Sequence, residues 1–300
     1  MKRLHLLNIS LATILLFLIS SCGNSSDNNE KEQIVEEVFD EDPTDNLYKF
    51  NNTLFSVPSP YEISILMKEA GIEYNPDLIN SVGNSVNYTS SFLKAINLGV
   101  YGSDLAYLNM NEQIPEATKY FATIKILAEE LQLSGSFDAS IIKRIEDNIA
   151  NEDSLLNILS RVYRNTDKYL KDNQRQDLGV LVITGGWIES LYFLTEIAQS
   201  TNNEKIKARL GEQKFPLDNL IKILTPYYNK SEDHTQLIES LIDLAYVYDG
   251  IDIEYTYAEP ETDKENKITV INSSTKLLMN QEHISMITEK IRKIRDLLIN

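Results

Sequence analysis

The sequence contains a single cysteine, and this scarcity narrows the chemistry open to the chain. One thiol cannot form an intramolecular disulfide or build a cysteine-ligated metal cluster. Histidine is almost as rare: of the three copies, only His234 and His283 follow residue 21, and each is solitary in its predicted helix. A His-Glu-x-x-His zinc motif is absent. We therefore expect neither a metal site nor a cofactor.

Recognisable catalytic motifs are missing as well. The chain has no Gly-x-Ser-x-Gly nucleophile elbow, no phosphate-binding loop and no dinucleotide-binding fingerprint. An enzyme that uses carboxylates and tyrosines alone has no such motif, because its residues meet only in space. Whether the protein is an enzyme therefore stays open, and the sequence favours a non-enzymatic role.

Basic residues are also outnumbered: the chain has 28 Lys and Arg and 45 Asp and Glu, which gives a net charge of -17. Removal of residues 1–21 would take away Lys2 and Arg3 and no acid, which makes the net charge of the mature chain -19. Nucleic-acid binding requires clustered basic residues, so we expect no nucleic-acid partner. The same charge disfavours adsorption of the folded body to anionic lipid.

The N-terminus has the pattern of a bacterial lipoprotein signal. Lys2 and Arg3 precede an apolar run, Leu11–Ile19, and small residues lead directly to Cys22. The run is too short for an ordinary spanning helix and is typical of a cleaved signal peptide, here residues 1–21. We expect diacylglycerol on the thiol of Cys22 and a further chain, such as palmitate, on its freed amine. Two or three acyl chains anchor a protein stably in a membrane, whereas one binds reversibly.

The residues after the cysteine indicate which membrane would hold the anchor. Gly23 stands where aspartate commonly signals inner-membrane retention, which favours the outer membrane, with the body facing the periplasm or the cell surface. Residues 22–54 are predicted to be the lipidated cysteine and an acidic tether, since nine acids oppose Lys31 between Gly23 and Asn46. Such a segment buries too little apolar surface to offset its ordering entropy, so we predict disorder.

Residues 55–300 have a helical hydrophobic period and predict a single, mainly α-helical domain. Ser59-Pro60-Tyr61-Glu62 is a capping box with proline at the first helical position, so a helix should begin there. Short loops and the lack of an internal repeat predict an irregular antiparallel bundle. Further helices are expected at 89–110, 115–133, 138–150, 152–173, 177–200, 203–210, 216–228, 232–250 and 277–299.

The last predicted helix is amphipathic. Its buried stripe should consist of Ile284, Ile287, Ile291, Ile294 and Leu298. Its basic side chains are Lys290, Arg292, Lys293 and Arg295. Cations suit the last turns of a helix, so we interpret this cluster as a solvated face rather than as an anion site.

Residues 251–271 depart from the helical pattern. The first part alternates with polar residues and places its apolar side chains at Ile251, Ile253, Tyr255 and Tyr257. A second extended run covers Ile268–Ile271, so we predict one small β-hairpin with a mobile loop at 259–267. Isolated hairpins are marginal in water, and this one should lie on the helical body or pair with another chain.

Residues 178–198 are apolar enough to suggest a membrane-spanning helix. However, the run is interrupted by Glu189, by Glu196 and by the pair Gly185-Gly186. Charged residues are rare in spanning segments, so a buried central helix explains the composition better.

Glycines also lie inside the predicted helix at 89–110, at Gly99 and Gly102. Each glycine inside a helix costs about 1 kcal/mol relative to alanine, and a structural gain should offset that cost. Small residues recur on both helices, with Gly186 and Ser190 at helical spacing on the second. We therefore predict that the two helices cross at close range.

This crossing would bring polar side chains together. Tyr101, Asp104 and Tyr107 are spaced three apart on one helix, and Glu189 and Tyr192 are spaced likewise on the other. The carboxylates and phenols could form a ligand-binding cleft for a small polar or cationic ligand, or Asp104 and Glu189 could act as general acid and base. The alternative is a buried network in which each tyrosine satisfies a carboxylate.

Five segments carry a resemblance to a group of known sequences: Ile19–Cys22, Ser59-Pro60, Leu98–Tyr107, Gly185–Ser190 and Gly211–Lys214. With them the chain resembles an uncharacterised family of all-helical envelope lipoproteins from Bacteroidota, over roughly residues 55–230. The resemblance implies an envelope lipoprotein. It transfers no activity and no functional residues.

Three functions stay open at this point. The favoured one is a lipid-anchored cell-envelope protein with a non-enzymatic binding or scaffold role, whose partner is an envelope protein or a small ligand. The alternative is an envelope hydrolase or lyase that uses paired carboxylates. The third is an assembly subunit whose hairpin at 251–271 accepts a strand from another chain.

Overall fold

The computed structural model describes residues 47–50, 53–56, 60–133, 139–149 and 175–300 without 265–266, together with positions 151, 154 and 158. The chain divides into two units, Met1–Asp40 and Glu41–Asn300, and the described residues all belong to the second. The predicted signal peptide, Cys22 and most of the tether lie outside the described residues. So does the helix predicted at 152–173, apart from two positions.

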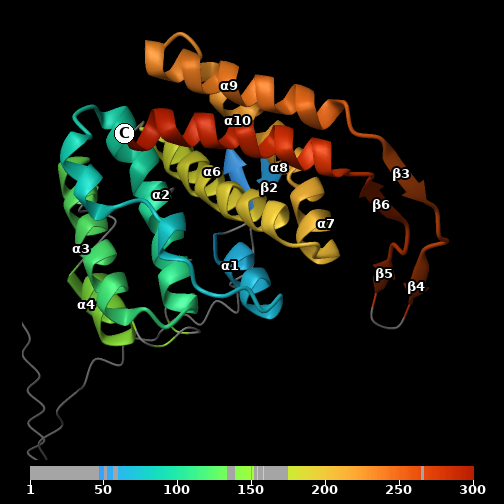
Figure 1. Ribbon diagram of the computed structural model, residues 1–300, viewed down its shortest axis with the longest axis horizontal. Helices are drawn as coiled ribbons and strands as arrows, with labels where there is room; N and C mark the ends of the chain where they lie inside the picture. Colours follow the sequence, from blue (N-terminus) through green and yellow to red (C-terminus); the bar gives the residue numbers. More distant parts are fainter. Residues whose placement is uncertain are drawn as a thin grey trace, which may run out of the picture. The chain divides into compact units, whose positions relative to one another are not determined.

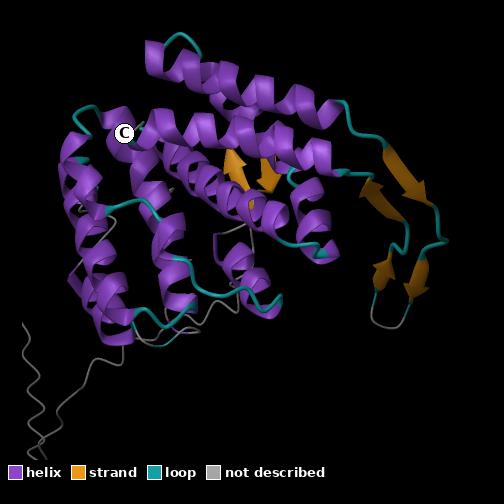
Figure 2. Cartoon of the chain, in the orientation of Figure 1, coloured by secondary structure: helices purple, strands orange, loops and turns teal. Residues whose placement is uncertain are grey.

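The described part of the chain is mainly α-helical, as the sequence predicts (Figures 1 and 2). Its helices are α1 (Pro60–Glu69), α2 (Ser91–Met110), α3 (Ile114–Glu130), α4 (Ala139–Asn148), α6 (Gln176–Ser200), α7 (Glu204–Glu212), α8 (Lys214–Leu224), α9 (Glu232–Asp249) and α10 (Gln281–Ile299). Short 3-10 turns are η1 (Pro76–Leu78), η2 (Val82–Asn87) and η3 (Thr225–Tyr227). The predicted bounds agree to within a few residues for these helices.

Side-chain caps explain where several helices begin. The hydroxyl of Ser90 accepts a hydrogen bond from the backbone N–H of Leu93 at the start of α2. Asn280 caps α10 in the same way through the N–H of His283, so this helix begins at Gln281 and not at the predicted position 277. Each cap satisfies a donor that the first helical turn would otherwise leave unpaired.

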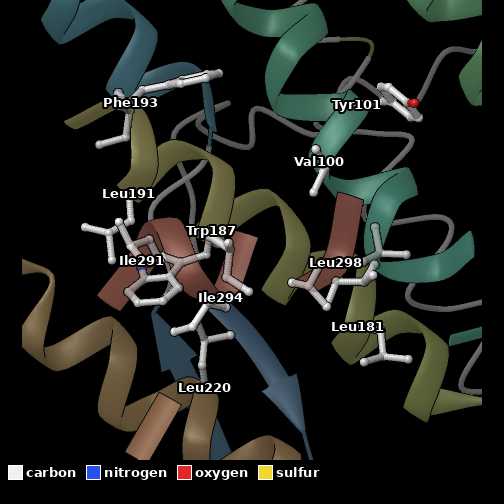
Figure 3. Packing of buried hydrophobic residues seen from close by; sticks show 14 of the residues in the cluster. Val100, Tyr101, Leu181, Trp187, Leu191, Phe193, Leu220, Ile291, Ile294 and Leu298 are labelled. Atoms are coloured by element: carbon white, nitrogen blue, oxygen red, sulfur yellow. The ribbon is translucent and has the colours of Figure 1, made fainter. Parts of the chain in front are cut away.

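The helix α6 occupies the centre of the described fold, where α2 and α10 pack against it (Figure 1). It is long and apolar enough to cross a membrane, yet 89% of its most apolar window is buried inside the protein, as expected for a central core helix. Trp187 of α6 packs near Ile291 and Ile294 of α10 and Leu220 of α8 (Figure 3). Its indole N–H donates to Oε1 of Gln213 at 3.0 Å, which satisfies a buried donor.

The predicted close crossing of α2 and α6 is confirmed. A Cβ atom on Gly99 would lie 1.9 Å from the carbonyl oxygen of Val182, and one on Gly185 would lie 1.9 Å from that of Ile96. These distances leave no room for any side chain, so glycine is required at both positions. The gain in backbone packing offsets the loss of helix propensity.

The structure corrects the end of the predicted tether. Strands β1 (Leu47–Phe50) and β2 (Thr53–Ser56) pair antiparallel, with Leu47 opposite Ser56. Regular structure is therefore present before residue 55. Two short runs rich in apolar and aromatic residues, separated by Asn51-Asn52, are a hairpin signal that the acidic composition of the preceding segment obscured.

The second hairpin is longer than predicted and has a different register. Strand β3 (Ile253–Thr256) pairs with β6 (Ser274–Leu277), and β4 (Glu261–Asp263) pairs with β5 (Ile268–Val270). The expected pairing of the first run with residues 268–271 is wrong, because the supposed loop contains β4, which takes β5 as its partner. Acidic residues are depleted in strands, so the composition of β4 gave no strand signal.

We expect Gly185→Ala to destabilise the protein by about 1–3 kcal/mol, because its Cβ would force the backbones of α2 and α6 apart. Gly186→Ala is the matched control. Its Cβ would meet no atom closer than 3.5 Å, so the change should be neutral or gain up to about 1 kcal/mol of helix propensity. Urea unfolding followed by far-UV circular dichroism measures both. Equal effects of the two substitutions would contradict the crossing geometry.

Candidate functional site

The structure brings the predicted site residues of α2 and α6 into one buried region. Asp104 and Glu189 are both fully buried, and their carboxyl groups lie within hydrogen-bonding reach of each other. Tyr101 and Tyr107 are buried as well, while Tyr192 is half-buried. The sequence thus predicted correctly that the crossing unites the two acids.

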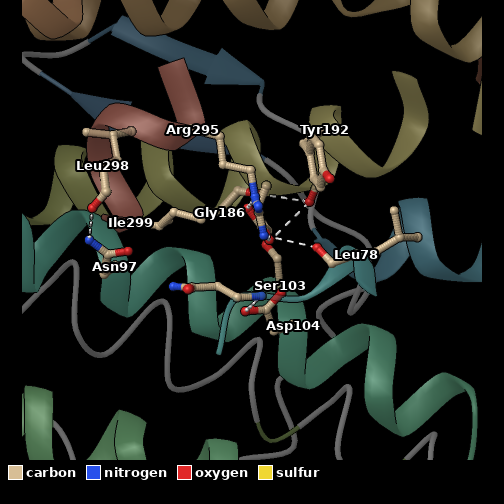
Figure 4. Close-up of polar contacts among 12 residues, drawn as sticks. Leu78, Asn97, Ser103, Asp104, Gly186, Tyr192, Arg295, Leu298 and Ile299 are labelled. Carbon is tan, nitrogen blue, oxygen red and sulfur yellow. Dashed lines mark hydrogen bonds and ion pairs between the residues drawn. The ribbon is translucent and has the colours of Figure 1, made fainter. Parts of the chain in front are cut away.

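A third charged residue completes the cluster (Figure 4). Arg295 of α10 is 7% exposed and forms a two-pronged ion pair with Glu189, in which Nε donates to Oε2 and Nη2 donates to Oε1, each at 2.6 Å. The same Nη2 donates to the carbonyl oxygen of Leu78 at 3.0 Å. The guanidinium also lies over the ring of Tyr192, 4.2 Å from its centroid. Glu189 is therefore fully engaged by protein groups.

Asp104 differs from Glu189 in its partners. Its Oδ2 accepts a hydrogen bond from the backbone N–H of Asn80 at 3.2 Å, while no donor reaches Oδ1. Burial and then the neighbouring carboxylate of Glu189 raise the pKa of Asp104 well above its usual range, against the opposing effect of Arg295. A proton retained by Asp104 lets its carboxyl group donate a hydrogen bond to Glu189. The cluster then holds one carboxylate, one guanidinium and one neutral carboxyl group.

The hydroxyl groups of Tyr101 and Tyr107 form hydrogen bonds with backbone groups and not with the two carboxylates. The hydroxyl of Tyr101 donates to the carbonyl oxygen of Ser81 at 2.8 Å, and that of Tyr107 accepts from the N–H of Asn75 at 2.8 Å. Burial raises the pKa of the Tyr101 phenol, which keeps it a neutral donor. The expected bonds from tyrosines to carboxylates are therefore absent for Tyr101 and Tyr107, and an arginine and a backbone N–H bond the two acids instead.

The segment that links η1 to η2 closes the cluster from outside. The carbonyl oxygen of Leu78 accepts from Arg295, and the N–H of Asn80 donates to Asp104. The carbonyl oxygen of Asn80 also accepts a hydrogen bond from the Tyr120 hydroxyl at 2.7 Å. The side-chain amide of Asn80 donates to the Tyr88 hydroxyl at 2.9 Å. Both acids are fully buried. A ligand-binding role at the five predicted positions therefore stays a prediction.

Arg295 is the residue that sequence reasoning misplaced. The interpretation as part of a solvated face is wrong for it, whereas Lys290, Arg292 and Lys293 are partly or largely exposed and pair with surface acids. The stripe offered a signal, since positions 288 and 295 each follow a buried isoleucine and are seven residues apart. Thr288 is indeed fully buried. Arginine is seldom buried without a partner, and nothing local to the sequence identified Glu189.

Two further features of the described residues bear on a possible site. Among the described residues, no group of three or more His, Cys, Asp and Glu side chains is placed to hold a metal ion. A pocket of about 30 Å³ lies between α2, α9 and α10, with Leu93, Leu237 and Ile294 in its lining. This volume suits one or two water molecules rather than a ligand.

No protein-family model, curated protein or solved structure matches the chain, so its function has to be argued from its own residues.

We expect Glu189→Gln to cost about 3–5 kcal/mol of stability, because it leaves the Arg295 guanidinium buried without a compensating charge. Asp104→Asn is the matched control. Its amide can replace the neutral carboxyl group, so it should change stability by less than about 1 kcal/mol at neutral pH. Chemical denaturation of the two variants decides between these outcomes. A larger loss from Asp104→Asn than from Glu189→Gln would show that Asp104 carries the necessary charge.

The raised pKa of Asp104 also predicts how stability depends on pH. Above the ordinary pKa of 3.8 the unfolded chain releases this proton, whereas the folded protein retains it until the raised pKa is reached. The folded state thus binds more protons, and the free energy of unfolding should fall as pH rises through this window, by at most about 1.4 kcal/mol per pH unit. Urea unfolding from pH 4 to pH 8 compares the wild type with Asp104→Asn. A constant difference across that range would contradict the assignment.

Proposed function

We propose that the protein is a lipid-anchored cell-envelope protein with a non-enzymatic binding or scaffold role. The signal pattern at residues 1–22 supports the anchor, and Gly23 supports the outer membrane. A relationship to the helical lipoproteins from Bacteroidota that the sequence resembles belongs to the same proposal. The acidic stretch after Cys22 would act as a spacer that lets the folded domain extend away from the bilayer.

The hairpin of residues 252–277, which contains β3 to β6, is the basis of the binding proposal. Large apolar side chains there are half or more exposed: Ile253 (50%), Tyr255 (62%), Tyr257 (67%), Ile268 (56%), Val270 (50%) and Ile271 (74%). Several large apolar and aromatic side chains exposed on one short segment favour an interaction site. The hairpin also extends away from the helices (Figure 2). A partner protein is therefore a better candidate than a small ligand in the closed body.

One observation favours the alternative of an envelope hydrolase or lyase. Asp104 and Glu189 are neighbours, and an acid held neutral beside a carboxylate is an arrangement that glycan-cleaving enzymes use. In this conformation both groups are sealed from solvent and Glu189 is paired with Arg295. Catalysis would need the segment around Asn80 to open. We therefore rank this function second.

The proposal is tested in cells that express the full chain, Cys22→Ser, or a trimmed chain in which Asn-Gly replaces residues 255–275. The trimmed hairpin keeps the Glu254–Lys276 pair, which a two-residue turn can close. Mass spectrometry should find acylated Cys22 without residues 1–21. The trimmed chain should keep its anchor and melting temperature while losing the crosslinked partner that the full chain retains.

Three outcomes would contradict parts of this proposal. An unmodified Cys22, or a retained signal peptide, would remove the lipid anchor. A partner that crosslinks equally well to the trimmed chain would place the binding surface outside the hairpin. Hydrolysis of envelope glycan or peptide that is abolished by Asp104→Asn in a folded protein would favour the enzyme instead.

A further inference from the structure

We propose that the outer edge of β3, over residues 252–257, binds an extended basic and apolar segment of a partner protein as an added strand. This inference rests on the binding role proposed above and specifies its chemistry. Strand addition combines backbone hydrogen bonds, which supply affinity, with side-chain contacts at alternate positions, which supply specificity.

The register of the hairpin shows which backbone groups are available. The N–H of Leu278 donates to the carbonyl oxygen of Asp252 at 2.8 Å, so Asp252 is at a hydrogen-bonded position. Glu254 and Thr256, two and four residues later, are at hydrogen-bonded positions too, opposite Lys276 and Ser274. In an antiparallel pair, hydrogen-bonded and non-hydrogen-bonded positions alternate. The N–H and C=O groups of Ile253 and Tyr255 therefore point away from β6. They form a short, regular row of donors and acceptors at the strand edge.

The helical body leaves this edge open. It is β6 that packs against α7, where the Cβ of Leu277 lies close to Gly211. In Figure 1, β3 lies on the side of β6 that faces away from the helices. Among the described residues, β3 has β6 as its sole strand partner. All six residues from Asp252 to Tyr257 are exposed.

The charges of the hairpin specify the partner. The outgoing arm, residues 252–263, contains five acids and no base, namely Asp252, Glu254, Glu259, Glu261 and Asp263. The returning arm, residues 267–277, contains Lys267 and Lys276 and no acid. A strand added at residues 252–257 meets the carboxylates of Asp252 and Glu254, and a segment with Lys or Arg is complementary to them. Its apolar residues would contact Ile253, Tyr255 and Tyr257.

A second copy of the chain is a poorer occupant of this edge. Two copies of residues 252–257 placed side by side would bring Asp252 and Glu254 of one chain against those of the other, on chains that each carry a net charge of -17. Like charges on neighbouring strands are destabilising. Pro260 lacks an N–H and follows the exposed run, so it limits the added strand to about six residues.

The test uses the full, lipidated chain with a photo-crosslinking residue in place of Tyr257. The crosslinked segment is identified by mass spectrometry, synthesised as a peptide and titrated against the mature chain by fluorescence anisotropy. Tyr255→Pro removes an outward N–H of β3 and should weaken binding by about tenfold or more. Thr275→Pro is the matched control, since Thr275 is opposite Tyr255 and its N–H points to the other edge of the same hairpin.

The expected result is a segment with Lys or Arg at alternating positions, whose affinity falls with added salt and is affected by Tyr255→Pro but hardly by Thr275→Pro. A crosslink to a second copy, an acidic segment, equal effects of the two prolines, or no crosslink from position 257 would each overturn strand addition. If the partner needs residues 255–275 but tolerates Tyr255→Pro, the edge proposal fails while the binding role stands. If the trimmed chain still binds the partner, both fail.

Discussion

The close approach of α2 and α6 is the constraint on which the rest of the structure depends. Gly99 and Gly185 allow the two backbones to touch, and Asp104 and Glu189 follow them on the same helices. Their carboxyl groups consequently lie close together, and both are fully buried. Two ionised acids could not share this space, so one must be neutral and the other must find a cation. The glycines thus determine the electrostatics of the core as well as its packing.

The cation comes from α10, which ties the end of the chain to its middle. A buried ion pair adds little net stability compared with apolar groups of the same size, but it fixes position. If α10 slid by one turn, about 5.4 Å, Arg295 would lose both Glu189 and the carbonyl oxygen of Leu78. Only three residues separate α10 from β6, so the register of this helix also fixes the base of the exposed hairpin.

Local signals in the sequence were sufficient to predict the described helices and the crossing of α2 and α6. Caps and hydrophobic periodicity located the elements, and the paired glycines located the contact between α2 and α6. Arg295 could not be placed in this way, because its burial depends on a partner 106 residues away. The pairing of β3 failed for a related reason. The acidic residues of β4 and the polar residues of β6 have weak strand propensity, so their pairing depends on the whole hairpin.

The helical body and the hairpin differ in how their backbone polar groups are satisfied. Around the cluster, loop groups such as the N–H of Asn80 are bonded to buried side chains. Along β3, the outward groups of Ile253 and Tyr255 face water, although exposed strand edges promote aggregation and are usually blocked by lysine, proline or a covering element. Here, acids flank the edge. These acids would repel the same edge of an identical chain. They are also complementary to the cationic segment that we propose as the added strand, so the same charges would protect the edge and select its partner.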